Sequence, residues 1–199
     1  MSTSESTYHH GSLRDALIAA GTAALEGSSG LDLSLRELAR EVGVSPAAVY
    51  RHFPNKDALL AEIAREGITM LGAAQRKAFD AAGGGSAGFA ETGRAYVRFA
   101  LAHPALFRLA FAHGKPLAIS ADSPDPAADL LHSATLELAR GDSAAAERLA
   151  MQAWAIAHGL AMLMLDGRLP PDDALIDRLV DTKSLFPIGR NEDAKGADS

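Results

Sequence analysis

Along most of the chain, apolar residues recur every three or four positions, which is the spacing that gathers them on one face of an α-helix. The first such run consists of Leu13, Ala16, Leu17, Ala20 and Ala24. No segment keeps the strict alternation of apolar and polar residues that is typical of a half-buried strand. The pattern therefore predicts an all-α protein.

Two short helices joined by a tight turn follow this run. Ser34–Glu37 forms a capping box, which begins a helix that Gly43 ends. Glycine suits this turn because it adopts the positive φ that a Cβ disfavours. Ser45 and Pro46 fit the N-cap and the first position of the next helix, which ends at Phe53. This arrangement predicts a helix-turn-helix, whose second helix enters the major groove of DNA.

A long helix is expected after Asn55, and it ends at Gly83–Gly85. Beyond these glycines, periodicity and the positions of the prolines predict helices near residues 87–102, 104–112, 126–140, 143–166 and 171–186. We therefore expect a helix-turn-helix domain at 8–60, a connecting helix at 61–82, a second helical domain at 87–188 and a frayed tail at 189–199.

Composition narrows the possible functions. Hydrophobic residues make up 48% of the chain and charged residues 22%, as in a globular protein with a core. The absence of cysteine excludes a disulfide scaffold, a thiol nucleophile and a Cys-ligated metal. The histidines lack the spacing of a metal site, so we expect neither a metal nor a cofactor. With a net charge of −6, any DNA-binding surface must be a local patch.

The longest apolar stretch is Leu149–Leu165, which contains Gln152 and His158. It is shorter than the roughly 20 residues that a membrane span usually needs, so a buried helix explains it better. The polar N-terminus also lacks the apolar run of a secretory peptide. We therefore expect a cytoplasmic protein with no membrane partner.

Residues Val44 to Leu60 contain the letters VS, YRHFPNKD and LL in order. They resemble the DNA-binding domain of the TetR/AcrR family of transcriptional repressors. The preceding Tyr8–Gly11 segment and the Leu13–Leu25 helix are similar to that domain as well, so the resemblance covers about residues 8–65.

A second resemblance lies in the C-terminal half. His103–Phe107 and Trp154–Gly159 resemble the ligand-binding domain called WHG, which one branch of the family carries. Together, the two resemblances imply a homodimeric transcriptional regulator, usually a repressor. Such a protein binds palindromic operator DNA and is released from it by a small-molecule effector.

Carried over position by position, the resemblance implies DNA contacts at Ser34, Ser45, Ala47, Ala48, Tyr50, Arg51, His52 and Lys56. Ser34 and Lys56 fall on phosphate-contacting positions, whereas the two alanines offer only methyl contacts. Arg51, or an arm near Tyr8–His10, is then the expected hydrogen-bonding reader of bases. The alternatives are that Tyr50 covers a seam between helices and that Lys56 is an ordinary solvated charge.

We expect the effector pocket in the second domain. Trp154, His158 and Met162 are spaced to share one helix face, opposite the aromatic residues of 87–112. The expected lining is Phe99, Phe107, Phe111, Trp154, His158 and Met162. A buried histidine beside the only tryptophan needs a polar partner. The alternative is that these side chains, with Phe89 and Tyr96, are simply core and that the histidine bonds a backbone carbonyl.

The same part of the chain carries a candidate dimer surface. The helix at 143–166 is apolar almost all round, which is expected of a helix buried against its own domain and against a partner. Small residues that would allow close approach lie at Ala146, Ala150, Ala153, Ala157 and Ala161. We therefore predict a homodimer built from the helices at 143–166 and 171–186.

Catalysis finds little support. Gly83–Gly88 satisfies loose forms of two glycine-rich catalytic motifs, but both motifs require a preceding strand, and a long helix is expected here. The interpretation is therefore a regulator and not an enzyme. Two rivals remain, namely a helical adaptor that kept the fold without operator binding and an all-α enzyme.

Overall fold

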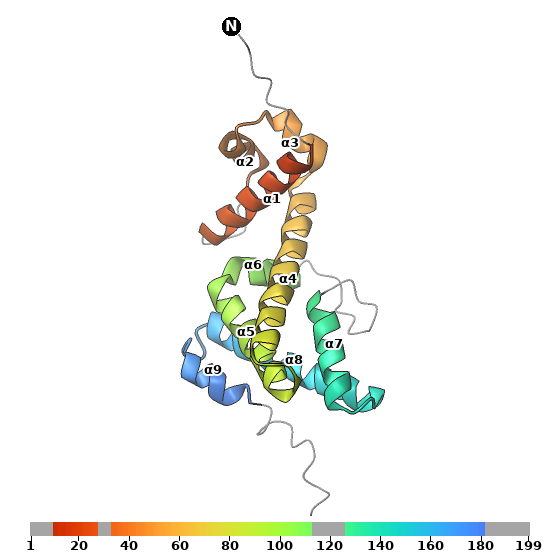
Figure 1. The fold of residues 1–199 in the computed structure, drawn as a ribbon. Helices are drawn as coiled ribbons and strands as arrows, with labels where there is room; N and C mark the ends of the chain where they lie inside the picture. The colour runs from red at the N-terminus through yellow and green to blue at the C-terminus, as the bar shows by residue number, and fades with distance from the viewer. Residues whose placement is uncertain (1–9, 28–32, 113–125, 182–199) are drawn as a thin grey trace, which may run out of the picture. The chain divides into compact units, whose positions relative to one another are not determined.

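The computed structural model describes residues 10–27, 33–112 and 126–181 of the 199-residue chain. Within these ranges the protein forms helices and no strand (Figure 1), which confirms the all-α prediction. The helices are α1 (His10–Gly27), α2 (Leu35–Val42), α3 (Pro46–His52), α4 (Lys56–Ala81), α5 (Gly85–Ala102), α6 (Pro104–Ala112), α7 (Pro126–Leu138), α8 (Ser143–Leu165) and α9 (Asp173–Leu179).

Two of the expected elements extend past the described residues. The helix expected at 171–186 corresponds to α9, which is shorter, and residues 182–186 lie outside the described part. The tail expected at 189–199 lies outside it as well.

The chain divides into two compact units. The first comprises residues 1–68 and 103–116, and the second comprises residues 69–102 and 117–199. The boundary falls inside α4, so this helix contributes to both units.

This division differs from the expected boundaries, because α6 belongs to the first unit and not to the second domain at 87–188. The backbone N–H of Leu106 donates to Glu26 Oε1 of α1 at 2.9 Å. A Cβ added to Gly67 would lie only 2.9 Å from the Leu106 side chain. Contacts between residues so far apart in the sequence leave no local pattern, and so the sequence did not predict them.

The core of the first unit follows from helical spacing. Leu13, Leu17 and Leu25 recur at multiples of four residues and form the buried face of α1. α1 packs against α2 and α6, and α2 packs against α3. Between α2 and the start of α4, the fully buried side chains include Leu38, Val49, Phe53, Leu59 and Ile63. This core fixes α2 and α3 against each other.

In the second unit, α5 packs against α7, α8 and α9, and α7 also packs against α8. Phe89 of α5, Ala134 of α7 and Leu149 of α8 form a buried cluster. Half-buried apolar side chains from α4, α7 and α8 surround it, namely Phe79, Leu131, Leu138 and Ala153. The core of this unit therefore lies where these four helices meet.

The structure corrects the role expected for the alanines of α8. Ala146, Ala150, Ala157 and Ala161 are between 0% and 4% exposed in the single chain. They share the side of α8 that packs against the protein's own α5 and α7, so they are not available as the seam of a dimer. Because α8 is apolar on most sides, its sequence did not distinguish the inner face from the outer one.

α8 is also the helix in the described residues that is long and apolar enough to cross a membrane by length and composition. Its most apolar window is 33% buried within the protein. One such helix is weak evidence for a membrane span, because core helices of soluble proteins have the same length and composition.

Candidate functional site

Hydrogen bonds fix both ends of α2, and the second end forms the turn into α3. Ser34 is the N-cap of α2, and its hydroxyl accepts from the backbone N–H of Glu37 at 3.5 Å. At the other end, Gly43 has a φ of 76°, and the N–H of Val44 donates to the carbonyl of Ala39 at 2.8 Å. These bonds satisfy the last carbonyls of α2 while the left-handed residue reverses the chain.

α3 is short and is anchored by its buried side. Ser45 is its N-cap and accepts from the N–H of Ala48 at 3.3 Å, and Pro46 takes the first position. Val49 is fully buried, and its carbonyl accepts from the N–H of Phe53 at 2.9 Å. The expected N-cap is therefore present, and the buried Ala48 and Val49 place one side of α3 in the core and leave the other in solvent.

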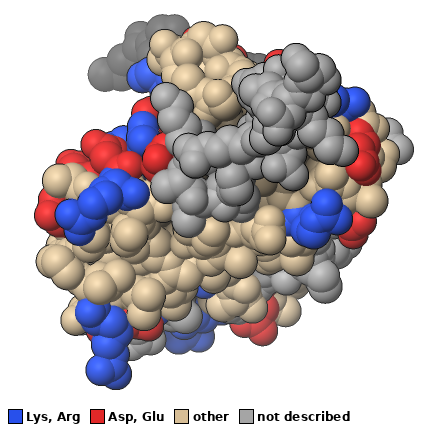
Figure 2. Space-filling view, turned by 90° about the horizontal axis from the view of Figure 1, so that it is seen from below, with Lys and Arg blue, Asp and Glu red and all other residues tan. Residues whose placement is uncertain are grey.

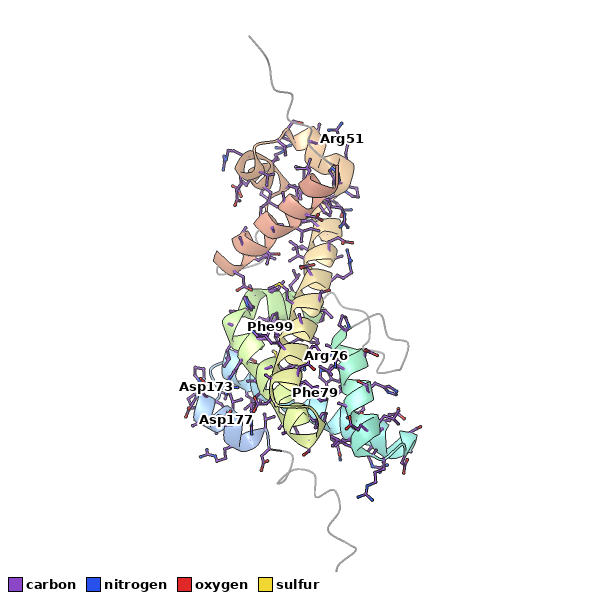
Figure 3. The ribbon with its side chains drawn as sticks, viewed as in Figure 1. Arg51, Arg76, Phe79, Phe99, Asp173 and Asp177 are labelled. Carbon is purple, nitrogen blue, oxygen red and sulfur yellow. The ribbon has the colours of Figure 1, made fainter. Side chains whose placement is uncertain are left out.

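The exposed side of α3 carries Ala47, Tyr50 and Arg51, whose spacing of three and four residues places them on one helix face. Tyr50 is 46% exposed, so it does not fill a seam in the core. Arg51 is exposed as well and lies on α3 (Figure 3). Ala48 is only 7% exposed, which corrects its expected place on the DNA-facing surface.

The remaining predicted DNA contacts lie at the edges of this face. His52 ends α3 and Lys56 begins α4, and both are half-buried. Ser34 and Ser45 use their hydroxyls to cap helices within the protein. Tyr8 and His9 lie outside the described residues, and α1 begins at His10.

Arg14 has a structural role that sequence analysis missed. Its Nη2 lies 2.6 Å from Glu62 Oε2, and its guanidinium lies over the Phe53 ring at 5.5 Å from the centroid. Glu62 also pairs with Arg65. Arg14 therefore links α1 to the end of α3 and to α4. It already forms an ion pair, unlike an arginine whose charge is available to a DNA phosphate.

Charges of both signs are spread over the protein. The segment from Ser34 to Leu60 alternates basic and acidic residues, with Arg36, Arg40, Arg51 and Lys56 against Glu37, Glu41 and Asp57. On the face drawn in Figure 2, blue and red side chains are likewise interspersed around a broad area that carries neither. Attraction to DNA would therefore depend on where individual side chains lie.

In the second unit, the structure brings Trp154 and His158 of α8 together with Tyr96 of α5. The Tyr96 hydroxyl lies 2.8 Å from His158 Nδ1, and Trp154 Nε1–H donates to the same hydroxyl at 3.3 Å. The Trp154 and His158 rings lie 5.9 Å apart between centroids. Tyr96 is thus a polar partner of the histidine, although the sequence suggested only a core aromatic.

Burial lowers the pKa of His158 below its ordinary value of 6.5. Removal from water disfavours the charged imidazolium, because the protein interior does not replace the solvation that water gives to the charge. The ring is therefore neutral at pH 7, with one nitrogen donating and the other accepting. A neutral ring matches its pairing with the uncharged Tyr96 hydroxyl.

The other expected lining residues are divided between the two units. Phe99 of α5 is buried and Met162 of α8 is half-buried, and both belong to the second unit. Phe107 and Phe111 lie on α6 in the first unit, with ring centroids 4.8 Å apart. Trp154 and His158 therefore lie together in the second unit, whereas Phe107 and Phe111 lie in the first.

Gln75 of α4 is a buried polar side chain that sequence analysis missed. It is 9% exposed, and its Nε2–H donates to the Thr92 carbonyl of α5 at 3.2 Å. Its Oε1 is buried and has no hydrogen-bond partner among the described residues. The sequence did contain one indication, because Gln75 lies four residues after Leu71, where the helical stripe calls for an apolar side chain.

Comparison with known families gives two matches. Residues 18–63 match the model described as bacterial regulatory proteins, tetR family. Residues 89–183 match the model described as tetracyclin repressor-like, C-terminal domain. The second description is a general one, so the narrower likeness to the WHG domain stays a prediction.

Solved structures are similar over nearly the whole chain. A protein of unknown function from Rhodococcus sp. RHA1 is 34% identical, with a TM-score of 0.71, and the match covers 92% of this chain and 97% of that one. The provisionally named regulatory protein SCO4313 is 24% identical, with a TM-score of 0.64 and coverages of 89% and 97%, and it supports the fold alone. No curated protein matches the chain.

Proposed function

Because the chain belongs to the TetR family of bacterial regulatory proteins, we propose that it is a repressor that a small-molecule effector releases from a palindromic operator. Membership of this family shows that the protein is a DNA-binding transcriptional regulator. The two matched domains point to a protein without enzymatic activity. The observation that carries the proposal is the α2–turn–α3 unit, which holds one face of α3 in solvent.

In this proposal, α3 reads the DNA through Ala47, Tyr50 and Arg51. An arginine on a recognition helix can donate two hydrogen bonds to guanine, which is the commonest specific contact in the major groove. Ala47 supplies a methyl group for contact with thymine, and Ser34 and Lys56 lie at flanking positions suited to phosphate. Ala48 is left out of the reading face because it is buried.

Two copies are needed to bind a palindrome, and we place the dimer surface on the outer side of α8 and on α9. The exposed apolar side chains there are Met151 at 49%, Leu163 at 46% and Leu179 at 39%. Ala155 is also exposed on α8. Burying this surface in a partner would remove apolar side chains from water, which is the usual driving force of an obligate interface.

The effector is proposed to bind in the second unit, near Trp154, His158 and Tyr96. Their mutual hydrogen bonds hold polar groups among apolar side chains, the usual composition of a small-molecule site. α4 contributes to this unit and also to the unit that holds α3. An effector that favours one conformation of α4 would therefore shift the population of DNA-binding states.

The experiment measures binding of fluorescent DNA taken from the flanks of the protein's own gene. The wild type should bind a specific fragment, and Arg51→Ala should lose affinity by roughly 1–3 kcal/mol through one base-pair position. Lys56→Ala should weaken binding about equally on all sequences and lower the salt slope by roughly 1. Arg76→Ala, which removes an exposed arginine of α4 in the second unit, is the matched control and should leave affinity unchanged.

Two results would speak against the proposal. Failure of the wild type to bind any flanking fragment would favour the adaptor alternative. Equal losses in Arg51→Ala and Arg76→Ala would show that α3 is not the DNA-reading element.

A further inference from the structure

We propose that Gln75 is the residue that selects the effector, by accepting a hydrogen bond from it at Oε1. The inference rests on the proposed function, because it assigns a ligand class to the effector site of the second unit. That class is a neutral molecule with an apolar body and one hydrogen-bond donor, such as a hydroxyl, an amide N–H or an un-ionised carboxyl.

The orientation of the Gln75 amide is fixed by its partner. The Thr92 carbonyl can only accept, so the amide end that faces it at 3.2 Å must be the NH2 group. The two ends of the amide cannot be exchanged without placing two acceptors against each other. The carbonyl oxygen is therefore the end left without a partner among the described residues.

A buried acceptor without a partner is unfavourable, because it has lost its hydrogen bonds to water and gained none in return. Native proteins pair most such groups, so an exception points to a ligand or a bound water. The other buried polar atom of this kind in the described residues is Arg94 Nε. It differs, because it lies 3.5 Å from Asp177 Oδ1 in a cluster of ion pairs.

Gln75 belongs to the same region as the aromatic polar group. Its partner Thr92 lies four residues before Tyr96 on α5, so both residues share one helix face. Tyr96 and Trp154 already hydrogen-bond each other, and the Tyr96 hydroxyl also meets His158. Gln75 Oε1 is thus the acceptor in this region that still lacks a donor among the described residues.

The surroundings select against ionised ligands. Leu71 and Phe79 lie one turn to either side of Gln75 on α4, and both are apolar. A carboxylate has no donor for Oε1, and its burial would be costly. A hydroxyl or amide supplies the donor without a charge, and the rest of the ligand can be apolar.

Selection by Gln75 would also connect binding to regulation. Gln75 is a residue of α4, the helix that contributes to both units. A hydrogen bond between effector and Gln75 therefore acts directly on the helix whose first turn carries Lys56. The ligand would favour the α4 conformation in which this bond is best made.

The test uses two probe pairs that differ only in the donor. These are cyclohexanol with cyclohexyl methyl ether, and benzyl alcohol with benzyl methyl ether. Binding to the full-length protein is followed by the emission of Trp154, the single tryptophan, without DNA present. Gln75→Met removes the amide at nearly constant volume, and the same substitution at exposed Gln152 is the matched control.

We expect the wild type and Gln152→Met to bind each alcohol about tenfold more tightly than its ether, as one hydrogen bond to a buried acceptor predicts. Gln75→Met should bind the two members of a pair equally. Its thermal unfolding temperature should change little, because the substitution removes an unpaired buried oxygen together with the hydrogen bond from Nε2 to the Thr92 carbonyl.

Three results would overturn the inference. The first is that the wild type binds neither member of either pair. The second is that it binds alcohol and ether equally, which indicates an ordered water at Oε1 and nothing more. The third is that the preference for alcohols survives in Gln75→Met. Because the assay contains no DNA, these results are independent of whether the protein binds an operator.

Discussion

At the scale of single residues, side chains of the same type differ in burial and in pairing. Ala47 and Ala48 are neighbours of the same type, yet one is exposed and the other is buried. Arg14 and Arg51 are both basic residues of the first unit, yet Arg14 is half-buried and paired with Glu62, whereas Arg51 is exposed. Contact with DNA is therefore possible only at positions that packing leaves on the surface. The exposed face of α3, which we propose reads the DNA, therefore consists of Ala47, Tyr50 and Arg51.

We predict that Gly43→Ala destabilises the first unit through its backbone alone. Gly43 has a φ of 76°, and an added Cβ would meet nothing within 4 Å. The cost should therefore be that of a left-handed alanine, about 1–2 kcal/mol, with no steric term. Urea unfolding measures it. Gly27→Ala is the control, since that position is also open but has no positive φ, and it should be neutral or slightly stabilising.

We also predict that His158 makes stability depend on pH. Burial lowers its folded pKa below 6.5, so the unfolded chain binds more protons at mildly acidic pH. The contribution of the neutral ring to stability is then complete above the unfolded pKa and is lost as pH falls through the folded pKa. The stabilities of the wild type and of His158→Gln from urea unfolding should approach each other as pH falls below about 6.5. Parallel curves would contradict the prediction.

At the scale of elements, local sequence signals were sufficient to predict the helices but not to predict which helices pack against each other. The caps Ser34, Ser45 and Gly43 act on residues within one turn, so the sequence predicted α2 and α3 closely. Tyr96 and His158 lie 62 residues apart, and their hydrogen bond depends on how α5 packs against α8. No sequence periodicity contains that information.

The position of α9 likewise depends on contacts between residues that lie far apart in the sequence. Arg98 of α5 reaches Asp173 and Asp177 of α9, each at 2.8 Å (Figure 3 labels both aspartates). The Asp173 hydrogen bond is the largest cause that raises the pKa of Arg98 above its ordinary value. These pairs are partly exposed, so each should contribute only about 0–1 kcal/mol. Close packing should matter more than charge at this contact.

We therefore expect Gly93→Ala to loosen α9 more than Arg98→Ala does. A Cβ on Gly93 would lie 2.7 Å from Val180 Cγ1, and a valine cannot rotate away easily. Displacement of Val180 should cost about 1–3 kcal/mol. Hydrogen exchange of the α9 amides measures the opening directly. Equal protection in the two variants, or faster exchange in Arg98→Ala, would show that ion pairs hold this helix.

At the scale of the whole molecule, α8 is the element whose assignment changed most. Its apolar character was recognised from the sequence. The face of α8 that packs inside its own unit was not recognised, because alanines suit close packing within a chain as well as between chains. The structure buries Ala146, Ala150, Ala157 and Ala161 in their own unit and exposes Met151 and Leu163. The two faces of α8 should therefore respond differently to the same substitution.

We predict that Leu163→Glu separates the dimer and leaves a folded monomer. Leu163 is 46% exposed in the single chain, so a glutamate there stays hydrated once the partner has gone. Within the dimer the same charge would be buried without a partner, which is strongly unfavourable. Sedimentation gives the mass, and far-UV circular dichroism shows whether the helices persist.

Ala153→Glu is the matched variant on the inner side. Ala153 packs against the cluster of Phe89, Ala134 and Leu149, so a glutamate there disrupts the second unit itself. We expect loss of cooperative unfolding together with loss of the dimer, because an unpaired charge in this cluster opposes folding of each chain. A folded monomer from Ala153→Glu and an intact dimer from Leu163→Glu would reverse the assignment. The partner would then contact the alanine side of α8, which the single chain could expose only by moving α5 and α7 away.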